Sequence, residues 1–252
     1  MPSTLTIPQQ FRGPPNSGNG GYVAGAVAER FPFGPSAPAD AAVQATLRAP
    51  IPLDTPLTLT CNDENHLHLT LGEQLIVEAE PVRLALDVPA PPDFAAARAA
   101  RDQSPSLQPR MNSLIPGGTG FHPVCVCCGA DVAEGEGLRV FAAPVPGFHG
   151  VAAAWRPPAA LADSGGLLPE RLVWTALDCP GQFAYLAEGI RTGLLGRMTA
   201  RILRPVPVDA DYVVIGWTLG VERRKHFAGT ALFDSQGALC AMAQQTWIGR
   251  ME

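Results

Sequence analysis

The sequence predicts an α+β fold built from two similar halves, each a helix followed by an antiparallel sheet. The first observation is an internal repeat: Thr46–Leu59 and Ile202–Ile215 share an Arg-x-Pro-x-Pro-x-Asp-like turn between apolar runs. The second is a glycine-bearing helix start upstream of each copy, and the third is period-two alternation downstream of each copy. We expect the halves to pack as a pseudo-dimer, since two-fold pairing is the commonest association of like units.

Residues 11–31 predict the first helix, and the strands of the first half follow it. A glycine-rich segment ends at Asn19-Gly20-Gly21, and the small residues after it offer a face on which a sheet could pack closely. Neither a dinucleotide-binding fingerprint nor a P-loop lysine accompanies these glycines, so phosphate binding is weakly supported. From Val43 to Leu86 apolar and polar residues alternate between turn signals, which predicts an antiparallel sheet.

The halves are predicted to span residues 1–88 and 120–252. Residues 89–119 are rich in proline and read as a linker, with an alanine-rich helical turn or two at Phe94–Arg101.

The stretch Arg171–Gly189 contains the second central helix, which we expect to begin at about Pro180. An apolar run leads to Pro180, a residue suited to the first turn of a helix, and apolar residues follow at helical spacing. Asp178 stands just before the proline, where its carboxylate can accept hydrogen bonds from free backbone amides. An acid there is either a helix cap or a catalytic group. The strands from Gly196 to Ile248 could wrap this helix.

Composition and charge exclude several classes of protein. With 252 residues the chain can form one large domain or two smaller ones, and 46% hydrophobic residues support a real core. A net charge of −5 and a pI near 5.5 argue against nucleic acid as a partner. The sequence shows neither a secretory signal pattern nor an apolar run long enough to span a membrane, so we expect a cytoplasmic protein with reduced cysteines.

The cysteine cluster Cys125, Cys127 and Cys128 raises the question of a metal. Cys-x-x-Cys is half of a zinc site, and no second pair follows at ligand spacing. A closed site would need His122 and another ligand from afar. We therefore expect the cluster to be free of metal, and we expect no cofactor.

Several stretches resemble the hotdog-fold acyl-CoA thioesterase superfamily, specifically its tandem members that are similar to acyl-CoA thioesterase II. Cys125–Gly129 and Gly137–Phe141 look like the lead-in of many hotdog domains, and Val151–Pro157 is similar to the strand before their central helix. The resemblance implies a double hotdog, in which two long central helices are each wrapped by a curved antiparallel sheet. It also implies hydrolysis of acyl-CoA or similar thioesters by a homo-oligomer of double-hotdog protomers.

The same resemblance assigns candidate site residues. Asn19-Gly20-Gly21 is similar to a His-Gly-Gly helix start whose backbone amide polarises the thioester carbonyl, although asparagine replaces histidine and no acid stands seven or eight residues after Gly20. Leu177-Asp178 looks like the Leu-Asp of acyl-CoA thioesterase II, in which an Asp, a Thr and a Gln orient the attacking water. Gln245 and Thr218 stand near the positions of that Gln and Thr. Gly181, at the second helix start, joins the expected substrate-binding residues.

The densest basic cluster is Arg223, Arg224 and Lys225, followed by His226. We expect it to meet the phosphates of coenzyme A, and the alternative is an ordinary solvated turn. Two functions remain open: a thioester hydrolase, or a non-catalytic hotdog protein that binds an acyl or CoA-like ligand or serves as an assembly module. A position of Asp178 beside a helix-start amide of the other half would favour the enzyme.

Overall fold

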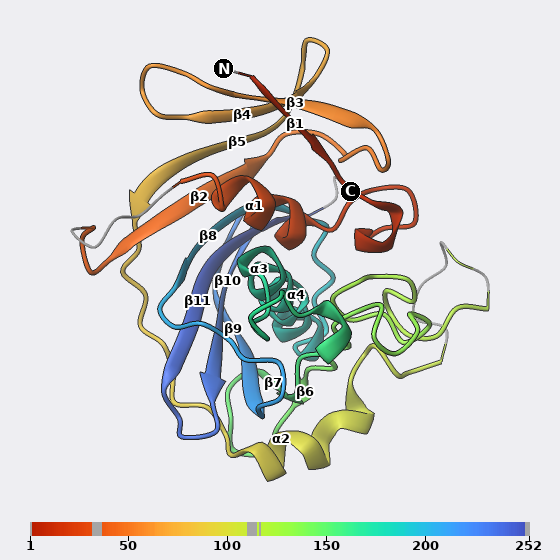
Figure 1. The fold of residues 1–252 in the computed structure, drawn as a ribbon. Coiled ribbons are helices and arrows are strands. Elements are labelled where there is room, and N and C mark those ends of the chain that lie inside the picture. Colours follow the sequence, from red (N-terminus) through yellow and green to blue (C-terminus); the bar gives the residue numbers. More distant parts are fainter. Residues whose placement is uncertain (1, 32–36, 110–114, 116, 250–252) are drawn as a thin grey trace.

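The computed structural model in Figure 1 describes residues 2–31, 37–109, 115 and 117–249. Within these residues eleven strands form one sheet in the order β1-β3-β4-β5-β2-β8-β11-β10-β9-β7-β6, and every neighbouring pair is antiparallel. The strands are β1 Ser3–Thr6, β2 Ala41–Leu47, β3 Pro56–Cys61, β4 Leu67–Leu71, β5 Gln74–Arg83, β6 Ala143–Pro144, β7 Val151–Trp155, β8 Leu194–Ile202, β9 Tyr212–Glu222, β10 Lys225–Asp234 and β11 Leu239–Ile248. The α-helices are α1 Gly20–Ala28, α2 Phe94–Ala100, α3 Glu170–Ala176 and α4 Asp178–Ala187.

The two halves repeat the same strand order. The first half runs β2-β5-β4-β3-β1 and the second runs β8-β11-β10-β9-β7, with α1 between β1 and β2 and α3–α4 between β7 and β8. The internal repeat is therefore confirmed, and its proline-rich turn joins β2 to β3 in one copy and β8 to β9 in the other. The halves meet where β2 pairs with β8, from Val43 opposite Ala200 to Thr46 opposite Arg197, so one sheet runs through the whole chain.

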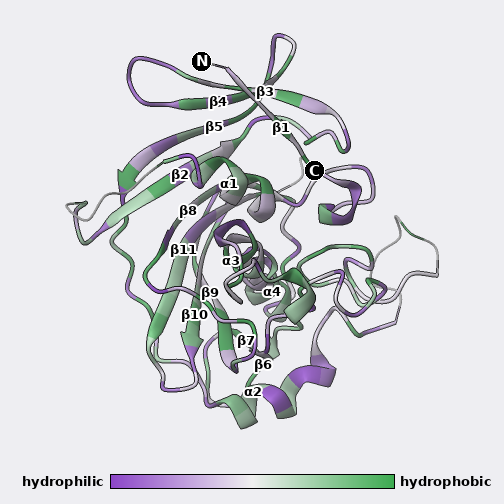
Figure 2. Ribbon diagram, in the orientation of Figure 1, coloured by the Kyte–Doolittle hydropathy of each residue, from purple (hydrophilic) through white to green (hydrophobic). Residues whose placement is uncertain are grey.

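Helices cover both faces of the sheet. Helices α1, α3 and α4 lie on the inner side of its curve, and α2 lies outside the second half (Figure 1). Strand β9 shows why both faces are covered: Val214 belongs to the main core, whereas its neighbours Val213 and Ile215 belong to a second core that includes Ala97 of α2. Figure 2 shows α2 carrying both apolar and polar residues, as a helix half-exposed on a sheet must.

The expected linker is thus partly structured. The predicted helical turns are present as α2, and α2 packs against the second half instead of hanging free. Residues 110–114 and 116 of that segment lie outside the described residues. No helix in the described part of the chain is long and apolar enough to cross a membrane.

The small-residue face of α1 packs on a helix, not on a sheet as expected. A side chain at Gly25 would meet the Cα of Arg171 at 2.7 Å and the Cβ of Trp174 at 2.8 Å, and one at Gly21 would meet the backbone of the same helix. Close contact of two helix backbones requires glycine at these positions. The prediction was wrong because the partner helix begins ten residues before Pro180, at Glu170.

The second helical segment is nearly continuous across α3 and α4. Leu177 joins them with φ −81° and ψ −7°, within the right-handed helical region although its ψ lies off the α-helical value. Asp178 consequently stands within a helical segment and makes no capping bond to α4. Its carboxylate is left available for the other half.

The first turns of α1 and α3 each meet an acid of the other half: Asp178, the first residue of α4, and Glu29, the residue after α1. The backbone N–H of Gly21 donates to Asp178, and the backbone N–H of Arg171 donates to Glu29 at the end of α1, at 2.8 Å. The two contacts are related by the same pseudo-two-fold symmetry as the strands. A carboxylate at a helix start is stabilised by the helix dipole.

Candidate active site

A cavity of about 260 Å³ lies between the two halves. The start of α1 and the end of β2 form one wall, and the starts of α4 and β8 form the other. The residues that line it include Asn19, Gly20, Arg48, His122, Cys125, Asp178, Cys179, Gln182, Leu195 and Ile248.

Asp178 is the buried acid of this cavity, with 3% of its surface exposed. Its Oδ2 accepts hydrogen bonds from Asn19 Nδ2 at 2.6 Å and from the Gly21 N–H at 3.2 Å. Asn19 Oδ1 in turn accepts from the N–H of Tyr22 at 2.9 Å, so one asparagine caps α1 and holds the carboxylate. The predicted proximity of Asp178 to Asn19-Gly20-Gly21 is confirmed.

The environment of Asp178 shifts its proton affinity. Burial raises the pKa of this carboxyl well above its usual range, and the negative charge of nearby Cys127 and Cys125 thiolates raises it further. The hydrogen bonds from Gly21 and Asn19 act in the opposite direction. Among the described residues, Oδ1 of Asp178 is buried without a hydrogen-bond partner.

Gly20 provides the helix-start amide that remains available. The N–H of Gly21 is taken by Asp178, and that of Tyr22 by Asn19. Within the described residues the N–H of Gly20 donates to no acceptor. A Cβ at this position would lie 2.9 Å from the side-chain end of Leu195, which would have to shift to accommodate it.

Gln245 lies behind Asp178 and does not line the cavity. It is fully buried, and its Nε2 donates to the carbonyls of Leu177 at 2.6 Å and Asp178 at 3.0 Å. Its Oε1 accepts from Trp247 and packs against Gly181. Gln245 thus positions the backbone at the α3–α4 junction, and Gly181 lies inside the helix beside it, outside the cavity lining.

Thr218 is not brought to the cavity. Its hydroxyl donates to Glu188 Oε1 at 3.1 Å, and Thr218 is absent from the lining. The basic turn Arg223–Lys225 lies closer, since Lys225 of β10 pairs with Ile248, a residue of the cavity wall. Arg224 is held by two hydrogen bonds to the carbonyl of Gly249.

Sequence reasoning missed a chain of polar contacts made by Gln182, which lies on the same wall as Asp178. Gln182 Oε1 lies 2.6 Å from His122 Nε2, and Gln182 Nε2 donates to Thr192 Oγ1 and to the Gly193 carbonyl at 2.9 Å. A signal was available, because Asp178 and Gln182 are four residues apart and share a helix face. His122 has no such signal, since it reaches the cavity through an irregular loop.

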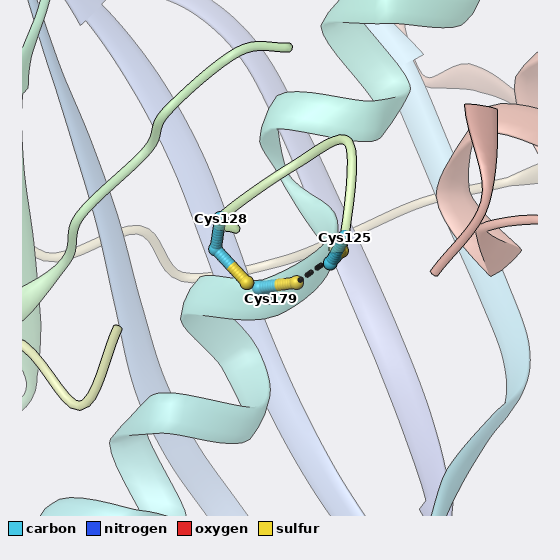
Figure 3. A group of neighbouring side chains, drawn as sticks. All are labelled: Cys125, Cys128 and Cys179. Carbon is cyan, nitrogen blue, oxygen red and sulfur yellow. Dashed lines mark hydrogen bonds between the residues drawn. The ribbon is translucent and has the colours of Figure 1, made fainter. Parts of the chain in front are cut away.

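Cysteines from two distant segments meet at the same place. Figure 3 shows Cys125 and Cys128 on the loop and Cys179 on α4. The three sulfur atoms lie within 4.8 Å of one another, and those of Cys125 and Cys179 are 3.7 Å apart. Hydrogen bonds from the Cys128 and Cys179 thiols hold the pKa of Cys125 well below its usual value. The sequence-based prediction of a metal-free cluster rested on the loop cysteines alone, whereas the structure adds Cys179 of α4 to the group.

Comparison with known proteins identifies the fold. No protein-family profile and no curated protein matches this sequence. Solved structures match over 99% of the chain: the tesB protein of Mycobacterium avium subsp. paratuberculosis (12% identity, 93% of its length, TM-score 0.59) and a protein assigned as a thioesterase from Novosphingobium aromaticivorans (14%, 96%, 0.61). A protein assigned as a thioesterase II from Thermobifida fusca matches similarly, with 16% identity over 94% of its length and a TM-score of 0.58.

The chain covers only 63% of one further thioesterase-superfamily protein, at a TM-score of 0.46, which is too low to support an argument. The full-length likenesses, by contrast, extend through both halves and the segment between them. The chain therefore shares the fold of these three proteins, which fits the expected hotdog fold.

Proposed function

We propose that this chain is a double-hotdog hydrolase of acyl-CoA-type thioesters, with Asp178 as the residue that activates water. The observation that carries the proposal is the position of Asp178: a buried carboxylate in a cavity between the halves, held by the helix start of the other half. The thioesterase names of the structural neighbours support the same reaction class.

The reaction needs two groups, and the cavity offers both. Asp178 takes a proton from a water molecule, whose oxygen then attacks the thioester carbonyl. The N–H of Gly20 stabilises the negative charge that develops on the carbonyl oxygen. Collapse of this tetrahedral intermediate breaks the carbon–sulfur bond, and the leaving thiolate receives the proton from Asp178. The products are a carboxylic acid and the free thiol of coenzyme A.

Gln245 contributes by position in this proposal. It ties down the carbonyls of Leu177 and Asp178, and so fixes the backbone from which the catalytic carboxylate projects. No role follows for Thr218, whose hydroxyl is engaged with Glu188.

The phosphate end of coenzyme A would meet cationic side chains at the cavity rim. Arg48 lines the cavity and forms an ion pair with Glu78. The basic turn adds Arg223 and Lys225, next to the strand end at Ile248. Guanidinium groups bind phosphates with directed, charge-assisted hydrogen bonds.

The test is turnover by Asp178→Asn on a panel of acyl-CoA thioesters, measured as release of free thiol. The amide keeps the shape of the carboxylate and cannot accept the proton, so turnover should fall by about 10²–10⁴-fold. Asp211→Asn is the matched control, because Asp211 makes only an exposed ion pair with Arg156. Wild-type turnover in Asp178→Asn would overturn the catalytic assignment. Tight acyl-CoA binding without hydrolysis by the wild type would identify the non-catalytic binder instead.

A further inference from the structure

The thiols that meet beside the cavity have the spacing of a metal site. Sulfur ligands lie about 2.3 Å from a tetrahedral zinc ion, which places two of them about 3.8 Å apart. The sulfur atoms of Cys125 and Cys179 are 3.7 Å apart, and Cys128 completes a group within 4.8 Å. Burial alone would not indicate a metal, because free cysteines are commonly buried. The meeting of cysteines from two segments distant in the sequence does indicate a metal site.

The local fold presents the two loop cysteines together. Cys125-Val-Cys-Cys128-Gly129 forms a tight turn in which the N–H of Gly129 donates to the carbonyl of Cys125 at 2.7 Å. A Cβ at Gly129 would collide with the carbonyl oxygens of Pro123 and Cys125, so the turn depends on glycine. This turn directs Cys125 and Cys128 toward Cys179 on α4 (Figure 3).

A second, independent observation points to a cation. Oδ1 of Asp178 is buried and, within the described residues, has no donor. A buried carboxylate oxygen without a partner is costly unless a positive charge lies nearby or the carboxyl is protonated, which the raised pKa of Asp178 favours in the absence of a cation. Asp178 borders the same cavity as Cys125 and Cys179.

We propose that Cys125, Cys128 and Cys179 bind one zinc ion as thiolates. Soft thiolate ligands in a tetrahedral arrangement favour zinc over magnesium or calcium. Cys125 and Cys179 line the cavity, so the proposed ligands lie beside the candidate active site. The ion ties the irregular loop before β6 to α4. The proposed zinc site does not depend on the proposed hydrolysis, because its ligands are the cysteines and not Asp178, and metal binding is measured without turnover.

The test begins with the wild-type protein, purified without added metal. Elemental analysis should find about one zinc per chain, or the metal-free protein should take up Co²⁺ with a thiolate-to-cobalt absorption band. Removing the metal with a chelator should lower the melting temperature, and added zinc should restore it. A wild-type protein that holds no zinc and gives no cobalt band would overturn the proposal.

Serine variants then identify the ligands. Cys125→Ser, Cys128→Ser and Cys179→Ser should each weaken Co²⁺ binding at least about tenfold and reduce the thiolate band. Cys61→Ser and Cys240→Ser are matched controls outside the cluster; Cys127 is not used as a control, because its thiol contacts those of Cys128 and Cys179. Full metal binding in Cys179→Ser, or equal loss of binding in the Cys61→Ser and Cys240→Ser controls, would overturn the ligand set. Activity of Asp178→Asn is a separate readout, so either proposal can fail without the other.

Discussion

At the scale of single residues, the site depends on side chains that each serve two contacts. Asn19 caps α1 through its oxygen and holds Asp178 through its nitrogen. Gln245 uses both of its polar atoms in the same way, donating to two backbone carbonyls and accepting from Trp247. Such residues leave little freedom for substitution, since each change breaks two interactions.

Gln245→Glu separates positioning from catalysis. The carboxylate keeps the shape of the side chain and removes the donors to the carbonyls of Leu177 and Asp178, which should cost about 1–3 kcal/mol for each unpaired group. We therefore expect lower stability in urea denaturation and lower turnover together.

Gln244→Glu is the matched control, because Gln244 precedes Gln245 on the same strand and its side chain is exposed. It should match the wild type in both measurements. A Gln245→Glu variant with unchanged stability and lost turnover would instead show that Gln245 acts on the substrate.

The sequence predicted part of this site. Asp178 and the glycines of α1 were identifiable because an acid and a helix start leave local patterns. His122 and Cys179 were not identifiable as site residues, because they reach the cavity through contacts across more than fifty residues of sequence. The expectation for Thr218 relied on alignment along a strand, and a strand position says nothing about which face meets the cavity.

At the scale of elements, period-two alternation predicted an antiparallel sheet from Val43 to Leu86, and β2 to β5 occupy Ala41–Arg83, whereas β1 was not predicted. The start of the second helical segment was predicted too far along the chain. Pro180 suggested a helix start, but helical structure already begins with α3 at Glu170. Pro180 is the third residue of α4, and proline is tolerated in a first helical turn. An apolar run without a clear period could equally have been a buried strand.

The turn between β9 and β10 carries a prediction about coenzyme A. Arg223→Gln combined with Lys225→Gln should raise KM for acyl-CoA severalfold and flatten its dependence on salt, because screening acts on exposed charges. Steady-state kinetics at low and high ionic strength measure both effects. Arg224 is left intact, since it anchors Gly249.

Arg30→Gln combined with Arg98→Gln removes the same charge away from the cavity lining and is the control. Identical KM values in the two double variants would show that the basic turn is an ordinary solvated turn.

At the scale of the whole molecule, the two halves depend on each other. Strand β8 pairs with β2 across their boundary, and the cavity takes residues from both sides. An unpaired β8 would present exposed backbone donors and acceptors at the edge of the sheet. The expectation of a homo-oligomer remains a prediction.

Cutting the chain between residues 88 and 89 tests this dependence. The two pieces should copurify when expressed together, whereas residues 89–252 alone should aggregate or self-associate through β8. Size-exclusion chromatography with light scattering measures the outcome. The intact chain with a flexible insertion at the same point is the control. A stable monomer of residues 89–252 would show that the halves are independent domains.

The paired acids at the two helix starts have a consequence for how such a chain can change. A dimer of identical subunits must keep two equal sites, because every substitution occurs twice. Here the related contacts have diverged: Asp178 borders the cavity, whereas Glu29 is neutralised by the guanidinium of Arg171 and serves as a structural cap. When the two halves are joined in one chain, one copy of this acid no longer has to be a catalytic residue. The copy at Glu29 can then be optimised for stability alone, and substitutions there should leave turnover at the other copy unaffected.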